Sequence, residues 1–220
     1  FSPDSKHVAY VSEHNLYVED VSTGQIRKLT NDGTRKMING TFDWVYEEEF
    51  GCRDGFRWSP DGKQIAFWQV DATKIRDYYM LNTTDSVYSK VIPVEYPKVG
   101  EAPSPVKIGV VTLAGGFIRW MKIEGDPRQH YLTRMEWSGP NELIVQQMDR
   151  KQQESKLIYC KPSDGSSYTF WAENDEAWVD MNTDNPVGWN WINKGQEFLW
   201  VSDKDGWRHI YKISRDGKNI

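Results

Sequence analysis

The stretch Phe56-Arg-Trp-Ser-Pro-Asp-Gly62, followed by Gln64-Ile-Ala-Phe-Trp-Gln-Val70, contains the pattern from which the fold is predicted. Ser-Pro-Asp-Gly suits a tight turn because Pro presets φ, Asp bonds its own backbone and Gly takes a positive φ. The segment after the turn is short, β-branched and aromatic, as expected of a half-buried strand. The stretch therefore predicts two antiparallel strands joined by a turn.

Three other parts of the 220-residue chain repeat this arrangement, beginning at Phe1, Met135 and Trp189. Short strands separated by turns follow each of them, without long helical periodicity. Dipeptides ending in glycine mark the hairpin tips that we expect before the last strand of a repeat: Thr23-Gly24, Asp164-Gly165 and Asp216-Gly217. A repeated four-stranded meander of about 40–50 residues is typical of propeller blades. The sequence thus predicts an all-β fold, a partial β-propeller of about four blade-like antiparallel sheets.

Composition excludes several classes of protein. Hydrophobic residues make up 38% of the chain and charged residues 27%, which is typical of a globular domain. The formal net charge of −5 argues against a surface for nucleic acid, which needs clustered Lys and Arg. Two cysteines, Cys52 and Cys160, are too few for a disulfide scaffold or a Cys-rich zinc site. We expect neither a metal nor a cofactor.

Two of the spacings between repeats are long enough to contain insertions. The first insertion runs from Asn39 to Gly55 and the second from Thr73 to His130. Insertions in repeat proteins usually gather on one face and often carry the function. We expect a function for the first, whereas the second is equally compatible with decorative loops. The mixed-charge stretch Asp149-Arg-Lys-Gln-Gln-Glu-Ser155 is predicted to be a solvated hairpin tip.

The first insertion contains an unusual run of acids, Asp43-Trp-Val-Tyr-Glu-Glu-Glu-Phe50. Neighbouring carboxylates repel one another unless a positive charge arrives between them. On a short helical turn among aromatic residues, two of them could converge on one cation. An ammonium–carboxylate pair at ~4 Å contributes roughly 4 kcal/mol at the effective dielectric of a protein surface. Such a site would bind a peptide N-terminus, an amine or a Lys side chain.

Two other interpretations of the acidic run stay open on the residues alone. The run also fits a solvated acidic turn with no ligand. Hard oxygen ligands suit calcium, but the run lacks the alternating Asp/Asn spacing of calcium-binding loops. A bare Glu-Glu-Glu does not decide among these three interpretations.

The acidic run and the turn that follows it resemble the N-terminal β-propeller region of the dipeptidyl peptidase IV family, which are serine exopeptidases. The resemblance covers nearly the whole chain and continues through two further segments: Tyr96-Pro-Lys-Val-Gly-Glu-Ala-Pro-Ser-Pro-Val-Lys107 and Gly206-Trp-Arg-His-Ile-Tyr211. It implies that the acidic insertion is a short helix projecting into a cavity between the propeller and a hydrolase domain. It also implies that Glu48 and Glu49 bind the substrate α-ammonium, whereas Glu47 has a structural or lesser electrostatic role.

The resemblance further implies a parent enzyme that releases N-terminal X-Pro or X-Ala dipeptides. Family members carry a Ser-Asp-His triad in a C-terminal α/β-hydrolase domain, whose nucleophile lies in Gly-x-Ser-x-Gly. No such pentapeptide occurs here, since Ser166 and Ser167 follow Gly165 without a glycine two positions beyond. We therefore expect residues 1–220 to be an incomplete β-propeller domain excised from a longer protein, without the catalytic domain.

The expected partners also come from the resemblance. They are a peptide substrate with a free N-terminus, the protein's own C-terminal α/β-hydrolase domain and a second copy of the parent in a homodimer. The expected compartment is extracytoplasmic, either periplasmic or cell-surface. The alternative function is a non-catalytic propeller scaffold for protein–protein interaction. A recognition role needs Glu48 and Glu49 side by side facing a concave surface, whereas a scaffold would leave them scattered on the outside.

The missing nucleophile predicts that the 220-residue chain has no peptidase activity of its own. The measurement is release of a chromogenic group from a dipeptidyl anilide with Pro at its second position. No release above the buffer rate is expected, and dipeptide release by the purified chain would contradict the assignment of catalysis to another domain.

Overall fold

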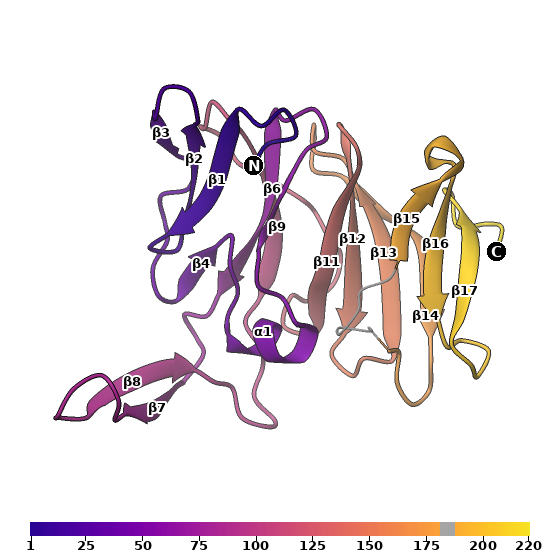
Figure 1. Ribbon diagram of the computed structural model, residues 1–220. Coiled ribbons are helices and arrows are strands. Elements are labelled where there is room, and N and C mark those ends of the chain that lie inside the picture. The colour runs from indigo at the N-terminus through magenta and orange to yellow at the C-terminus, as the bar shows by residue number, and fades with distance from the viewer. Residues whose placement is uncertain (181–187) are drawn as a thin grey trace.

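The computed structural model describes residues 1–180 and 188–220, which form successive antiparallel sheets standing side by side (Figure 1). The first sheet has the order β1-β2-β3: β1 (His7–Ser12), β2 (Asn15–Asp20) and β3 (Ile26–Lys28). The second has the order β10-β9-β6-β4, with β5 also paired to β6: β4 (Met37–Asn39), β5 (Phe56–Trp58), β6 (Gln64–Asp71), β9 (Val106–Thr112) and β10 (Arg119–Trp120).

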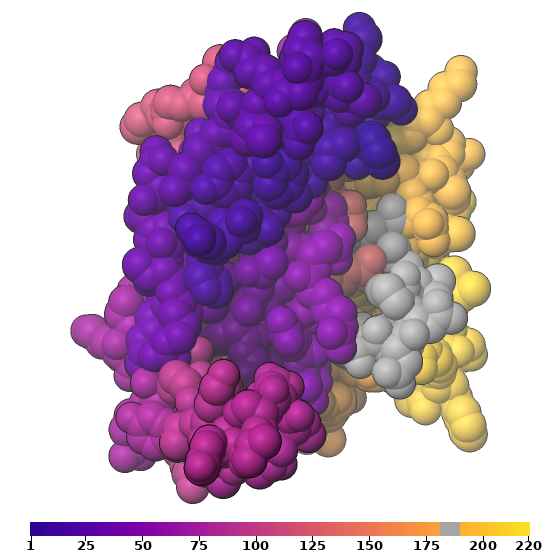
Figure 2. Space-filling model, turned by 60° about the vertical axis from the view of Figure 1, so that its left-hand side comes forward, coloured from indigo at the N-terminus to yellow at the C-terminus, as the bar shows by residue number. Residues whose placement is uncertain are grey.

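The third sheet is a four-stranded meander: β11 (His130–Gly139), β12 (Glu142–Asp149), β13 (Glu154–Cys160) and β14 (Ser167–Asn174). The fourth has the order β15-β16-β17: β15 (Gly188–Ile192), β16 (Glu197–Ser202) and β17 (His209–Ser214), with a 3₁₀ turn, η1, at Asn193–Gly195. A separate hairpin of β7 (Asp77–Asn82) and β8 (Lys90–Glu95) projects from one end of the molecule (Figures 1 and 2). The predicted all-β class with blade-like antiparallel sheets is confirmed.

Apolar layers between neighbouring sheets form the core. One cluster joins the first and second sheets around Phe67, another joins the second and third around Trp68, and a third joins the third and fourth around Phe198. These three rings are at most 1% exposed. The aromatic-rich composition is therefore used to fill the space between sheets. Within the described residues, no helix has the length and apolarity needed to cross a membrane.

Two sequence-based expectations need correction. The start of the first repeat, Ser2 to Ser5, forms a turn closed by the Ser5 N–H on the Ser2 carbonyl (2.9 Å), so that repeat contributes three strands. The second insertion is also shorter than predicted, because β9 pairs along the length of β6 and completes the second sheet. The β7–β8 hairpin lies between β6 and β9 in the sequence. The spacing of the repeats therefore assigned β9 to the insertion instead of to the second sheet.

Two of the three predicted hairpin tips are confirmed. Thr23-Gly24 lies between β2 and β3, and Asp164-Gly165 lies between β13 and β14. Asp216-Gly217 forms a turn after β17, closed by the Gly217 N–H on the Ser214 carbonyl (2.8 Å), and its place at a hairpin tip stays a prediction.

The edge strand β11 links the second and third sheets. It is the outermost strand of the third sheet, and a register shift follows the pairing of Leu132 with Gln147, so backbone groups on its outer side need partners from outside that sheet. The Trp68 indole Nε1–H donates to the Leu132 carbonyl (2.8 Å), and the Leu132 N–H donates to the Tyr46 hydroxyl oxygen (3.0 Å). Leu132, Trp68 and Tyr46 are all at most 1% exposed, so these bonds satisfy polar groups that water cannot reach.

Replacing Tyr46 with Phe should lower the free energy of unfolding by about 1–3 kcal/mol, because the Leu132 N–H would remain buried without an acceptor. The measurement is the urea unfolding midpoint of the protein. Tyr10→Phe, in the half-buried Tyr10–Tyr17 stack of the first sheet, is the matched control and should change the midpoint little. Equal midpoints for Tyr46→Phe and the wild type would contradict the role given to this hydroxyl.

Candidate functional site

The acidic insertion leaves and rejoins the second sheet at two glycines. Gly40 N–H donates to the Trp68 carbonyl (2.9 Å), and the Trp68 N–H donates to the Gly55 carbonyl (3.0 Å), so both ends sit on the same residue of β6. Gly55 N–H also donates to the Gly40 carbonyl (3.0 Å), and a Cβ on Gly55 would lie 2.6 Å from the Gly40 carbonyl carbon. Gly40 has a φ of 75°. A side chain at position 55 would therefore force the neck of the insertion apart.

The insertion contains the predicted helix, α1 (Trp44–Phe50), with a cap at each end. Asp43 is the N-cap, and its carboxylate accepts from the Tyr46 N–H (3.2 Å) and from the Ser104 hydroxyl (2.6 Å). Burial raises the pKa of Asp43, while these two hydrogen bonds act in the opposite direction. Gly51 ends the helix in the left-handed conformation, with a φ of 62°.

Aromatic side chains fix the orientation of α1. Tyr46 and Phe50 are four residues apart, lie on one face and are buried. Phe50 packs on the ring of Tyr131 in β11, with ring centroids 4.9 Å apart. At the other side, Trp44 lies against Tyr96, with centroids 4.0 Å apart. The helix is therefore held by the core and cannot rotate without breaking these contacts.

The predicted site residues lie on the solvent side of α1. Glu47 is half-buried, whereas Glu48 and Glu49 are exposed. Consecutive helix residues project about 100° apart, so the two carboxylates occupy adjoining faces of the same turn. The sequence-based prediction of a short helix bearing these acids is confirmed; their binding of an ammonium stays a prediction.

The position of the acids on the helix is electrostatically unfavourable. Glu48 and Glu49 lie in the last turn of α1, which contains no basic residue. The C-terminal end of a helix carries partial negative charge, so it repels carboxylates in addition to their mutual repulsion. A cation bound between them would relieve both effects. Local violations of this kind are expected at functional sites.

One glutamine from the third sheet contacts the acidic helix. The Gln152 Nε2 donates to Glu49 Oε1 at 2.5 Å. Gln152 lies in the turn between β12 and β13, within the stretch predicted to be a solvated tip, yet it is only 7% exposed. That prediction is wrong for this residue. No local sequence signal marks it, because its burial depends on α1, which is 103 positions away in the chain.

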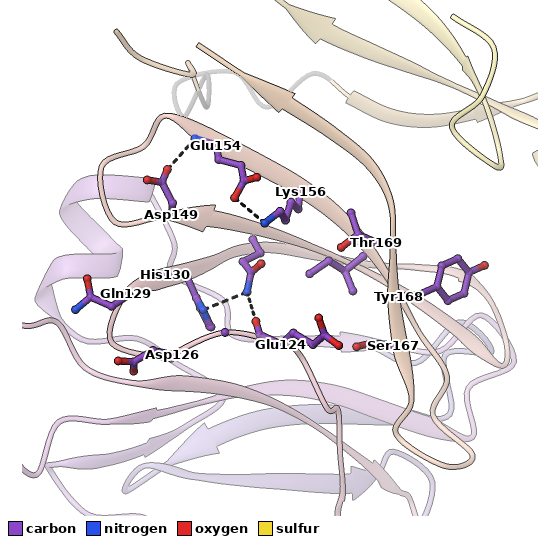
Figure 3. Close-up of a pocket in the computed structure, with 13 residues that line it drawn as sticks. Glu124, Asp126, Gln129, His130, Asp149, Glu154, Lys156, Ser167, Tyr168 and Thr169 are labelled. Carbon is purple, nitrogen blue, oxygen red and sulfur yellow. Dashed lines mark hydrogen bonds and ion pairs between the residues drawn. The ribbon is translucent and has the colours of Figure 1, made fainter. Parts of the chain in front are cut away.

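A cavity of about 590 Å³ lies elsewhere, on the third sheet, and neither Glu48 nor Glu49 lines it (Figure 3). His130 and Gln147 are central to it. The Gln147 Nε2 donates to the Glu124 carbonyl (2.8 Å) and lies 3.1 Å from His130 Nδ1. At its rim Lys156 pairs with Glu154 (2.6 Å). Gln147 therefore joins His130 to the Glu124 backbone inside this cavity.

Both cysteines are free. Cys52 Sγ lies 3.4 Å from the Thr133 carbonyl, and burial raises the pKa of Cys52 to about 12. Burial likewise raises the pKa of Cys160 to about 12. Both thiols are therefore protonated at neutral pH and are poor nucleophiles.

Stacked antiparallel sheets with an acidic helix inserted into one of them are typical of a β-propeller. The chain belongs to the dipeptidyl peptidase IV (DPP IV) N-terminal region family, whose model matches residues 1–220. It is similar in structure to the dipeptidyl peptidase 4 of Porphyromonas gingivalis, with a TM-score of 0.90 and 29% identity over 99% of this chain and 31% of that one.

Curated relatives agree with this family. "Probable dipeptidyl peptidase 4" of Emericella nidulans is 28% identical over 99% of this chain and 30% of that protein. "Inactive dipeptidyl peptidase 10" of Rattus norvegicus is 28% identical over 83% of this chain and 24% of that protein. The chain thus spans about a quarter to a third of the length of these relatives.

The cavity predicts a pH dependence of stability. Burial lowers the pKa of His130, and a neutral ring can accept from Gln147 at Nδ1. Because the folded His130 binds a proton less readily than the unfolded one, the unfolded chain gains protons first as pH falls below the ordinary value of about 6.5. The free energy of unfolding should therefore decrease in this range.

His130→Gln removes this titration and should make the urea midpoint fall less between pH 7.5 and pH 5.5 than it does in the wild-type protein. Parallel pH profiles for the two proteins would show that His130 is not the group responsible.

Proposed function

We propose that this chain is the substrate-recognition propeller portion of a serine dipeptidyl peptidase that releases N-terminal X-Pro or X-Ala dipeptides. In this proposal Glu48 and Glu49 bind the α-ammonium of the substrate. The observation that carries it is that Glu48 and Glu49 stand side by side in one turn of a helix that is capped at both ends and anchored in the core. Family membership supports it, since relatives are named dipeptidyl peptidases.

Recognition of the ammonium would work mainly through position. A rigid helix fixes where the substrate begins, so that the second peptide bond falls at a nucleophile supplied by the C-terminal α/β-hydrolase domain of the parent. Two carboxylates next to one ammonium form charge-assisted hydrogen bonds, which are stronger than neutral ones. Blocked N-termini carry no such charge and would be excluded.

The same proposal gives the parent a second copy of itself as partner. The β7–β8 hairpin supports a homodimer because it exposes several large apolar side chains at one end of the molecule (Figure 2). Exposed apolar patches are typical of association surfaces. The most exposed of them are Tyr79 (68%), Leu81 (65%), Val87 (97%) and Tyr88 (85%).

A second candidate function is a non-catalytic scaffold for protein–protein interaction. The relative from Rattus norvegicus named "Inactive dipeptidyl peptidase 10" favours it, because a chain of this family can belong to a protein described as inactive. The two candidates differ in one measurable property of the full-length protein, which is dipeptide release from a peptide with a free N-terminus.

In the full-length protein, Glu48→Gln combined with Glu49→Gln should lower kcat/KM for a dipeptidyl anilide by about 100-fold or more, because two charged contacts with the ammonium are lost. Glu47→Gln, on the same helix turn, is the matched control and should have a much smaller effect. Unchanged turnover in the double variant would refute the site, and a wild-type protein without activity would favour the scaffold.

A further inference from the structure

The buried Gln152 occupies a conformation that only its surroundings can maintain. Its backbone φ is 57°, in the left-handed region that side chains other than glycine and asparagine rarely adopt. It lies between β12 and β13 and is 7% exposed, although charged residues flank this hairpin tip. A polar side chain buried at a hairpin tip needs hydrogen-bond partners within the structure.

Hydrogen bonds hold the backbone around Gln152 from both sides. The Gln152 N–H donates to the Asp149 carbonyl (3.0 Å), and the Val179 N–H donates to the Gln152 carbonyl (2.8 Å). The Asp149 carboxylate accepts from the N–H groups of Gln153 and Glu154, both at 2.7 Å. The turn is therefore rigid, and the direction in which Gln152 extends its side chain is fixed.

This side chain extends to the acidic helix. Its Nε2 donates to Glu49 Oε1 at 2.5 Å. A glutamate at an exposed helix position otherwise samples several rotamers, whose restriction opposes binding of any ligand. A hydrogen bond from a buried, rigid donor restricts the carboxylate in advance and leaves its second oxygen for another partner.

The chemical type of the donor also matters. An amide orients a carboxylate without neutralising it, whereas a Lys or Arg at the same place would form an ion pair and compete with an incoming cation. Gln152 thus holds Glu49 while preserving its full negative charge. A donor with these properties is what a preorganised cation-binding carboxylate needs.

We propose that Gln152 is a positioning residue that holds the Glu49 carboxylate ready for the substrate ammonium. The inference rests on the proposed function, since it assumes that Glu49 binds the ammonium. It predicts that loss of the Gln152 amide weakens capture of the substrate without changing the chemical step.

The test uses the full-length protein with Gln152→Asn, which retains an amide and tolerates the left-handed backbone but is one methylene too short to reach Glu49. KM for a dipeptidyl anilide with a free amine should rise about tenfold, with kcat changed less than about twofold. Gln152→Gly, which suits the backbone best, should give the same result. The thermal midpoint of both variants should stay close to that of the wild type.

Gln153→Asn is the matched control. It changes the same residue type at the next position, where the side-chain amide donates to the Glu176 carbonyl instead of to the helix. Its KM should equal that of the wild type. If KM of Gln153→Asn rose as much as that of Gln152→Asn, the effect would come from the turn as a whole, and the proposal would be overturned.

A double-mutant cycle with Glu49→Gln separates this inference from the proposed function. If Gln152 acts through Glu49, adding Gln152→Asn to Glu49→Gln should raise KM no further. An equal further rise would overturn the inference. A raised KM in Glu49→Gln together with a normal KM in Gln152→Asn would also overturn the inference, but this result would leave the proposed function intact. A normal KM in Glu49→Gln would overturn both.

Discussion

The need to satisfy the backbone N–H and C=O of one buried residue, Leu132, organises the centre of this molecule. Leu132 lies in β11, the edge strand of the third sheet, and it is 1% exposed. An unpaired buried backbone group costs as much as a lost hydrogen bond. Trp68 from the second sheet and Tyr46 from α1 supply the two missing partners. Two sheets and the inserted helix are therefore connected at one residue, and none of them can shift without exposing a polar group.

This connection explains how a helix of seven residues can be a stable platform. Isolated helices of this length do not persist in water, because nucleation is costly and few hydrogen bonds follow. Here Asp43 caps one end, Gly51 ends the other, and Tyr46 and Phe50 bury one face. The opposite face is then free to carry charges that the helix itself disfavours.

The cavity on the third sheet and the acidic helix differ in how their polar groups are paired. In the cavity on the third sheet, His130 pairs with Gln147, and Lys156 pairs with Glu154. At the acidic helix, Glu48 and Glu49 concentrate negative charge at the unfavourable end of a helix dipole, and the buried donor on Glu49 is a neutral amide. An amide partner orients a carboxylate without neutralising it, which is the property expected of a site for a cation.

The sequence by itself determined the local features of this protein. Turn chemistry and short β-branched and aromatic strands predicted the antiparallel sheets, because these depend on neighbours in the chain. The short helix from Asp43 to Phe50 was predicted through its resemblance to the dipeptidyl peptidase IV family. Only the tertiary structure placed β9 in the second sheet, Leu132 between the Trp68 donor and the Tyr46 acceptor, and Gln152 on Glu49. These contacts join residues 36 to 103 positions apart, and no local propensity records which distant surfaces will meet when the sheets pack.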